Sequence, residues 1–490
     1  MNKLNRSMLQ ADKRTVAPAS VLQIGEGNFL RGFVDWMIHE CREQGLYEGA
    51  IAVTQPRPSG KPKIDALNEQ DRLYTLVVRG LEGGERVERK ITVTAFAEAF
   101  DPYSDWERFI RTGVSPALRV VVSNTTEAGL VYRQETLKEG EPILSFPGKI
   151  AYLLYRRYVA CEGAADRGLV FLPCELLERN GDALRDAVLR YAEDWGLPEP
   201  FKEWVRAHNR FLNSLVDRIV TGYPEREQAE AWFAEWGYRD DLLCVAEPYH
   251  LWAIEAESEL EALLPFRQAG LNVHWVDDLK PYQQRKVRIL NGAHTLMAPL
   301  GIVRGFEHVR GLMEDAEMGE FVRSAVIGEI VPSLPYDRDE MKAYADTVFE
   351  RYANPFIRHR LADIAMNSVS KFGTRLLPSL EYYAERGEPV PGGLAEGLAG
   401  LLRYYRVVRS GERFVGKTLA GDEYEVRDDA RVLDTMASIW ENAEQAPLRS
   451  TVVRLLAERS LWGRDLSVWP GLAEEIERRL AQWLGNGGME

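Results

Sequence analysis

Residues 21–32 read VLQIGEGNFLRG and combine a short apolar strand, a glycine-rich turn and the start of a helix. Gly25 and Gly27 follow the strand directly, where glycine lets the backbone turn tightly and approach a pyrophosphate at a helix N-terminus. The full dinucleotide fingerprint has a third glycine at the position of Leu30. The segment therefore favours a dinucleotide site, and a strand–turn–helix without a ligand is the alternative.

Strand-like and helical segments alternate through the first two-thirds of the chain. Each predicted strand is short, apolar and bounded by polar residues or glycine. This alternation implies βαβ units and a mostly parallel sheet, hence an α/β domain of Rossmann type. The predicted strands are Val21–Ile24, Ala50–Thr54, Val120–Ser123 and Leu169–Leu172, and the predicted helices are Phe33–Cys41 and Asp182–Trp195.

Helical periodicity dominates after about residue 280, so we expect a mostly α-helical C-terminal domain. A boundary near Asp277–Pro281 divides the chain into a Rossmann-type NAD-binding domain, 1–279, and a helical substrate and catalytic domain, 280–490. Small-molecule sites favour clefts between domains, and we expect one here. The helices predicted in this half include Gln283–Ala298, Asp337–Tyr352, Ile357–Val369, Ala430–Asn442 and Leu472–Leu484.

The composition excludes several classes of protein. The chain has 490 residues and a formal net charge of −14, which argues against a general nucleic-acid binder. No apolar run approaches the roughly 18 residues that span a bilayer, and the N-terminus has no secretory signal, so no membrane association is expected. The four cysteines lie far apart and form no CxxC, which fits a reducing cytoplasm.

Two further segments are expected to face a cofactor at the carboxyl edge of the sheet. The second strand ends in Thr54-Gln55-Pro56-Arg57, without the acidic residue that usually holds the adenine ribose. Arg57 suits a 2′-phosphate, so these residues leave NAD and NADP open. The loop after the third predicted strand supplies Asn124, Thr125, Thr126 and Glu127. Its alternative interpretation is a helix N-terminus capped by one of the threonines.

The segment 281–299, PYQQRKVRILNGAHTLMAP, predicts a buried helix that carries polar residues. On a regular α-helix Asn291 lies about 140° from Lys286, and His294 about 80° from it. Burial lowers the pKa of a lysine, which would make Lys286 a general base. Asn291 would then donate to a developing alkoxide, and His294 would fix a hydroxyl. This set suits alcohol–ketone interconversion without a metal; a lysine that snorkels to solvent beside a core Asn and His is the alternative.

Other polar residues have plainer interpretations on spacing alone. Asp217 and Arg218 read as a structural ion pair, and Lys371 reads as a surface lysine. The seven histidines include no pair at metal-ligand spacing, and no HExxH or GxxxxGK[ST] motif occurs, so no metal is expected.

Four segments in a fixed order carry a family resemblance. GEGNFLRG (25–32), NSLVDRI (213–219), EPYHLWAIE (247–255) and KVRILNGAH (286–294) resemble the mannitol dehydrogenase family of polyol-specific long-chain dehydrogenases. The resemblance covers about residues 20–380 and extends beyond them. The family's K-x-x-x-x-N-x-x-H pattern falls on Lys286, Asn291 and His294, which are then the expected catalytic residues.

Within the family, the chain length, EPYHLWAIE and NPFIRHRLADIAMNSVSKF (354–372) resemble one branch most. That resemblance implies NAD as cofactor, a small sugar-acid substrate, and interconversion of D-altronate and D-tagaturonate. Fructuronate and mannitol are the alternative substrate types, and a non-catalytic dinucleotide sensor is the alternative of another class. The residues expected at the cofactor are Gly25, Gly27, Asn28, Phe29, Arg31, Asn124, Thr125, Thr126 and Glu127; those expected at the substrate are Asp217, Arg218 and Lys371.

The chain departs from the family pattern at two places. Cys174-Glu175-Leu176 stands where the family often has Cys-Asp-Asn, whose asparagine is a second oxyanion donor. Gln283 stands where some members carry a glutamate three residues before the lysine. We therefore expect Asn291 to carry more of the alkoxide stabilisation.

Overall fold

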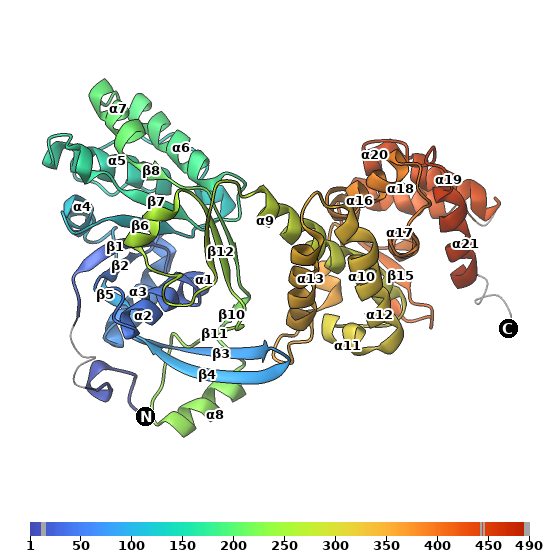
Figure 1. Cartoon of the computed structure of the whole chain (residues 1–490), viewed down its shortest axis with the longest axis horizontal. Coiled ribbons are helices and arrows are strands. Elements are labelled where there is room, and N and C mark those ends of the chain that lie inside the picture. Colours follow the sequence, from blue (N-terminus) through green and yellow to red (C-terminus); the bar gives the residue numbers. More distant parts are fainter. Residues whose placement is uncertain (11–15, 442, 444–445, 485–490) are drawn as a thin grey trace. The chain divides into compact units, whose positions relative to one another are not determined.

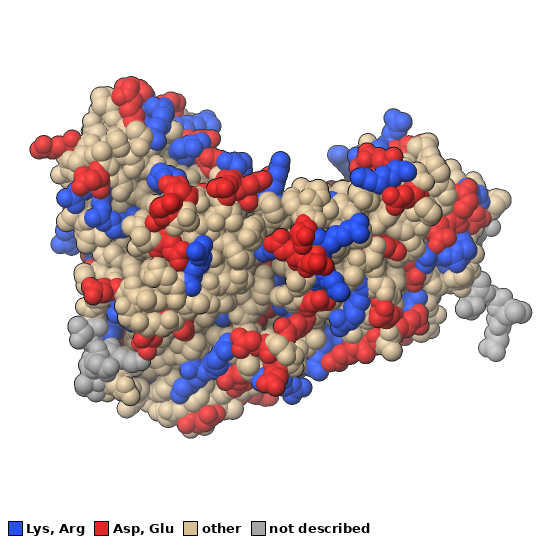
Figure 2. Space-filling view, in the orientation of Figure 1, with Lys and Arg blue, Asp and Glu red and all other residues tan. Residues whose placement is uncertain are grey.

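The computed structural model describes residues 1–10, 16–441, 443 and 446–484. The chain divides into two compact units, Met1–Leu279 and Lys280–Glu490 (Figure 1). Within the described residues, no helix has the length and apolar character needed to cross a bilayer. Acidic and basic side chains are intermingled on the face drawn in Figure 2.

A six-stranded, wholly parallel sheet forms the centre of the first unit. The strand order reverses between β1 and β6, and doubly wound sheets bind ligands outside the carboxyl ends of the strands at such a point. The predicted Rossmann-type sheet is confirmed, and two predicted strands have the predicted bounds. The order is β5 (Phe96–Phe100), β2 (Ala50–Thr54), β1 (Ala19–Ile24), β6 (Val120–Ser123), β7 (Val170–Pro173) and β8 (Arg210–Phe211).

Helices cover both faces of this sheet, which is why its strands are apolar throughout. Val21 of β1 packs in the core beneath α1 (Asn28–Arg31), α2 (Val34–Glu43) and α3 (Lys61–Glu69). Its neighbour Leu22 points the other way. That second face is covered by α4 (Trp106–Val114), α5 (Phe146–Ala160), α6 (Asn180–Asp194) and α7 (Glu199–His208).

Two smaller sheets complete the first unit, and the sequence analysis predicts none of their strands. Most of these strands have three to five residues, too few to show a period, and β4 carries exposed charged side chains. One sheet has the order β10 (Val220–Gly222), β11 (Cys244–Ala246), β3 (Tyr74–Glu82), β4 (Glu85–Val93); the other has the order β13 (Val273–Val276), β12 (Leu251–Glu255), β9 (Ser214–Asp217). The remaining elements are α8 (Arg226–Trp236) and the 3-10 helices η1 (Arg6–Met8), η3 (Pro58–Gly60), η4 (Glu127–Gly129), η5 (Ala165–Arg167) and η6 (Ser258–Leu263).

The second unit is mostly helical, as predicted, with one small sheet of β14 (Val407–Ser410), β15 (Arg413–Lys417) and β16 (Glu423–Val426). Helix α10 (Asn291–Val303) is buried on nearly every side, so its apolar composition reflects a central place. Helices α12 (Ala316–Ala325), α14 (Leu361–Ile364), α15 (Ser368–Arg375) and α17 (Gly392–Tyr404) pack against α10. The other helical elements of this unit are α9 (Lys280–Arg285), α11 (Val309–Glu314), α13 (Arg338–Tyr352), α16 (Leu377–Glu385), α18 (Ala430–Glu441), α19 (Leu448–Ala457), α20 (Arg459–Trp462), α21 (Leu472–Leu484), the π-helical segments η7 (Lys286–Leu290) and η8 (Val326–Ile330), and the 3-10 helix η9 (Val331–Ser333).

Two helix predictions need correction. The helix predicted at 357–369 is wrong, because Asn367 adopts a left-handed conformation (φ 54°) that separates α14 from α15. The helix predicted at 283–298 is interrupted by the π-helical segment η7. The helix predicted from Ala430 is described to Glu441, and Asn442 lies outside the described residues.

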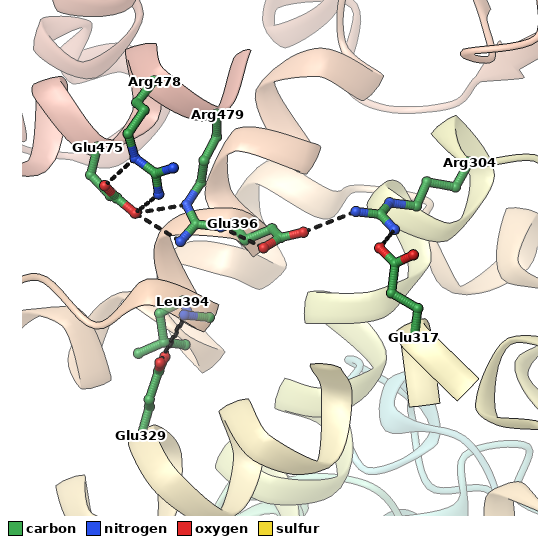
Figure 3. A network of polar contacts seen from close by, with 9 residues as sticks. Arg304, Glu317, Glu329, Leu394, Glu396, Glu475, Arg478 and Arg479 are labelled. Carbon is green, nitrogen blue, oxygen red and sulfur yellow. Dashed lines mark hydrogen bonds and ion pairs between the residues drawn. The ribbon is translucent and has the colours of Figure 1, made fainter. Parts of the chain in front are cut away.

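A network of ion pairs joins the helices of the second unit (Figure 3). Arg304, at the end of α10, bonds to Glu317 of α12 and, at 3.1 Å, to Glu396 of α17. Glu396 also pairs with Arg479 of α21. Glu329 accepts hydrogen bonds from the backbone amides of Gly393 and Leu394, in the first turn of α17. These contacts join α10 to α12, α17 and α21, and so hold the helix that carries Asn291 and His294.

Candidate active site

The glycine-rich turn lies at the carboxyl end of β1. Gly25 has φ 136° and donates its N–H to the carbonyl of Thr54 at 2.8 Å. A β-carbon on Gly25 would lie 2.7 Å from the carbonyl oxygen of Asn124. Gly27 has an ordinary extended φ of −71°, and a β-carbon there would meet no atom within 4 Å. The open space beside Gly27 is the kind of cradle that a pyrophosphate needs.

We expect Gly25→Ala and Gly27→Ala to weaken NADH binding for different reasons. The Gly25 variant is strained by about 1–3 kcal/mol and clashes with Asn124, so both its melting temperature and its affinity should fall. Gly27→Ala fills only open space and should keep the melting temperature while raising the Kd for NADH about tenfold. Thermal melts and NADH fluorescence titrations measure both quantities. Unchanged NADH affinity in Gly27→Ala would contradict a pyrophosphate site there.

Arg31 stabilises the glycine-rich turn through hydrogen bonds to Glu26 and Asn28. Its side chain is only 3% exposed, and it donates to the carbonyl of Glu26 at 2.8 Å and to Oδ1 of Asn28 at 2.7 Å. The Asn28 side chain lies against Gly222, which has no room for a β-carbon. The ring of Phe29 stacks on Phe33 at 5.0 Å. We therefore propose that these three predicted cofactor residues shape the turn, whereas Gly25 and Gly27 approach the cofactor.

The buried carboxylate of Glu175, one of the departures from the family pattern, holds the loop after β6. Glu175 accepts hydrogen bonds from the N–H of Thr125 at 2.9 Å, from its hydroxyl, and from the hydroxyl of Ser123. Asn124 donates to the carbonyl of Cys174 at 2.8 Å. Burial raises the pKa of Glu175. Neither Thr125 nor Thr126 caps an α-helix, because only the three-residue η4 follows.

The outer part of this loop and the turn after β7 complete this side of the sheet edge. Thr126 and Glu127 are exposed, so they stay available to a ligand. Asn180 does not replace the missing oxyanion donor, because its amide donates to the carbonyls of Pro173, Glu175 and Ser214. Its backbone lies at the start of α6, and its role is structural.

Asp217 and Arg218 are buried at the end of β9. Arg218 donates to the carbonyls of Glu247 at 2.9 Å and Gly32 at 2.7 Å, and its guanidinium lies 4.1 Å from the ring centre of Trp36. Burial lowers the pKa of Arg218 to about 10. This arginine therefore anchors the junction of α1 and α2, and we propose a positioning role for it.

A π-helical turn brings Lys286 and Asn291 closer to the same side of the helix. The N–H of Asn291 donates to the carbonyl of Lys286, five residues earlier, so one helical turn closes between them. The π-helical segment reduces the angle of about 140° that a regular α-helix would place between Lys286 and Asn291. Such insertions occur frequently at functional sites. Lys286 and Asn291 are half-buried, so the expected burial holds fully only for His294.

Two polar groups on this helix remain uncommitted among the described residues. The Nε2 atom of His294 is buried and has no hydrogen-bond partner. The side-chain amide of Asn291 makes no hydrogen bond, whereas the backbone carbonyl of Asn291 accepts from the side chains of Thr295 and Arg375. The His294 ring lies 4.5 Å from the Tyr352 ring. A buried polar atom without a partner is costly, and a ligand hydroxyl would relieve the cost.

Basic side chains lie near enough to His294 to act on its charge. Burial, and then His359, Arg351, Arg375 and Lys371, lower its pKa well below the usual value, so the imidazole is neutral at pH 7. Lys371 donates to the carbonyl of Ile364 at 2.9 Å. Lys371 was predicted from the sequence, whereas His359, Arg351 and Arg375 were not. Arg375 was within reach of sequence reasoning, because residues four apart share a helix face. No three His, Cys, Asp or Glu side chains of the described residues gather as a metal site.

The sheet with its glycine turn and the helix with Lys286, Asn291 and His294 define a two-domain dehydrogenase of the Rossmann class. The family model for the mannitol dehydrogenase Rossmann domain matches residues 19–265, and that for the mannitol dehydrogenase C-terminal domain matches residues 278–484. The chain belongs to the mannitol dehydrogenase family.

Two relatives are similar over nearly the whole chain. An altronate oxidoreductase of Halalkalibacterium halodurans is 41% identical over 97% of this chain and 93% of its own length. One of Bacillus subtilis is also 41% identical, over 97% of this chain and 94% of its own length. A D-sorbitol dehydrogenase crystal structure has the same fold, with a TM-score of 0.78 and 22% identity over 99% of each chain. The Pseudomonas fluorescens mannitol 2-dehydrogenase ternary complex with NAD and D-mannitol has a TM-score of 0.65 and 20% identity, over 99% of this chain and 97% of that one.

Proposed function

We propose that this protein is an NAD-dependent altronate oxidoreductase, which interconverts D-altronate and D-tagaturonate. The near full-length identity to two altronate oxidoreductases supports this substrate. The observation that carries the proposal is the buried Nε2 of His294, which has no partner. The positive charges of Arg351, Arg375 and Lys371 act on the same ring. A neutral polyol has no use for those cations, whereas the carboxylate of a sugar acid is stabilised by them.

The first unit fits the cofactor, because Gly27 leaves open space at the turn and Gly25 adopts the left-handed conformation that the turn requires. NAD, when bound, supplies or accepts the hydride. Gly25 and Gly27 would hold its pyrophosphate, and Thr126 and Glu127 are exposed beside the carboxyl edge of the sheet.

The second unit would supply the acid–base chemistry. Lys286 takes the proton of the substrate hydroxyl during oxidation and returns it during reduction. The free amide of Asn291 donates to the oxyanion that develops at the same atom. His294 holds a neighbouring substrate hydroxyl through Nε2. Arg375 or Lys371 would hold the carboxylate.

The proposal is tested by oxidation of NADH at 340 nm with purified protein and EDTA present. D-Tagaturonate should be reduced with a kcat/KM at least about tenfold above those for D-fructuronate and D-fructose. Preference for D-fructuronate would support the same reaction chemistry but would show that D-tagaturonate is not the substrate. Tight NADH binding without turnover of any of the three would contradict the enzyme and favour a dinucleotide sensor.

We also propose the cytoplasm as the place of action. All four cysteines are unpaired and three are buried, which suits a reducing compartment. Free sugar-acid substrate and NAD are the only partners that this function needs.

A further inference from the structure

The end of β2 lacks the acidic residue that usually binds the adenine ribose, but Glu26, in the turn after β1, places a carboxylate near that position. β1 and β2 are parallel neighbours, with Ile24 opposite Thr54 (Figure 1). Glu26 follows Gly25 at the carboxyl end of β1. Its Oε1 atom lies 2.6 Å from the position that a β-carbon on Gly60 would occupy, in the connection that follows β2. The carboxylate of Glu26, in the turn after β1, therefore lies beside the connection that follows β2.

Gly60 is a glycine for reasons of space and not of backbone conformation. Its φ of −79° and ψ of −13° are open to any residue. The space that its side chain would fill is taken by the Glu26 carboxyl group and by Cβ of Gln55. The fold therefore keeps this position clear for Glu26.

The other polar side chains near the end of β2 are either hydrogen-bonded to protein groups or exposed, so they suit the adenine ribose less well than Glu26. Gln55 is fully buried and donates to Oδ1 of Asp101 at 2.6 Å. The same Asp101 oxygen accepts the N–H of Tyr103 at 3.0 Å. Glu26 is half-buried, and its carboxylate makes no hydrogen bond or ion pair with the described residues. Arg57 is exposed and contributes the opposite charge.

We infer that Glu26 replaces the usual second-strand acid, binds the adenine ribose hydroxyls of NAD, and excludes NADP. In Rossmann-type domains an acidic side chain beside this strand end accepts from the ribose 2′-hydroxyl. A 2′-phosphate would meet a half-buried carboxylate of the same sign, which disfavours its binding. This inference rests on the proposed function in taking NAD as the cofactor, and it decides against Arg57 as a phosphate site.

Coenzyme binding without substrate tests the inference apart from the proposed function. NADH and NADPH are titrated against the full-length protein by fluorescence, and Kd values are compared. The wild type should bind NADH at least about a hundredfold more tightly than NADPH. Glu26→Gln keeps the shape and removes the charge, so NADPH binding should tighten about tenfold and NADH binding should weaken about tenfold.

Two further variants separate the contributions. Glu26→Asp keeps the charge and withdraws it by one methylene, so NADH binding should weaken while NADPH binding stays poor. Arg57→Ala is the matched control and should leave both affinities within about twofold. Thermal melts check that each variant is folded.

Unchanged affinities in Glu26→Gln, or a loss of NADPH binding confined to Arg57→Ala, would overturn the inference. Turnover distinguishes its failure from that of the function. If the expected coenzyme preference occurs without turnover of D-tagaturonate, the proposed function fails and the role of Glu26 stands. If neither coenzyme binds the wild type, both are wrong.

Discussion

Lys286→Ala is expected to lower kcat about 100- to 10,000-fold and to leave the Kd for NADH unchanged. Lys286 begins the π-helical segment η7 in the second unit, whereas the glycine-rich turn belongs to the first. Removing the amine therefore removes proton transfer without touching the turn. Steady-state reduction of D-tagaturonate at 340 nm measures kcat, and NADH fluorescence measures binding.

Two controls make the Lys286 result specific to proton transfer. Small primary amines added to Lys286→Ala should restore part of the activity, because they reach the vacated space and carry the proton. A merely structural lysine would not be rescued. Lys342→Ala removes an exposed lysine of α13 and should keep wild-type turnover. More than about a tenth of wild-type turnover in Lys286→Ala would rule out its role as general acid and base.

Asn291→Ala is expected to lower kcat about 100- to 1,000-fold, the usual effect of losing one oxyanion donor. The amide of Asn291 has no other hydrogen bond within the described residues, so the deletion leaves no partner unsatisfied. The backbone bond from Asn291 to Lys286 does not involve the side chain and should persist. The KM for D-tagaturonate should change less than threefold, because the interaction strengthens only as the oxyanion forms.

Asn291→Asp is the matched variant for this prediction. It keeps the size of the side chain, removes the N–H donors and places a negative charge beside the developing oxyanion. We expect a loss at least as large as that of Asn291→Ala, with an unchanged melting temperature. If both variants lost thermal stability together with kcat, the role of Asn291 would be structural, and the oxyanion assignment would be contradicted.

Local sequence patterns predicted the parts of the fold that depend on local physics. The strands at 50–54 and 120–123 appear with their predicted bounds, because continuous apolar residues between polar ends favour a strand covered on both faces. The glycine-rich turn was also predictable from local sequence, because the φ of 136° at Gly25 depends on the residue type at that one position. Periodicity was misleading where a single residue overrode it, as at Asn367.

The sequence by itself determined the class of the first domain and the helical character of the second, and it predicted Lys286, Asn291 and His294 as the catalytic residues. Only the tertiary structure decided what those residues face. The π-helical turn that aligns Lys286 with Asn291, the cations around His294 and the hold of Glu175 on Thr125 join residues in a way that no regular local spacing shows. Glu26 is the clearest case. Its carboxylate lies at the end of the second strand because strand pairing brings Gly60 beside the first turn, and pairing between distant segments is set by packing and not by local sequence.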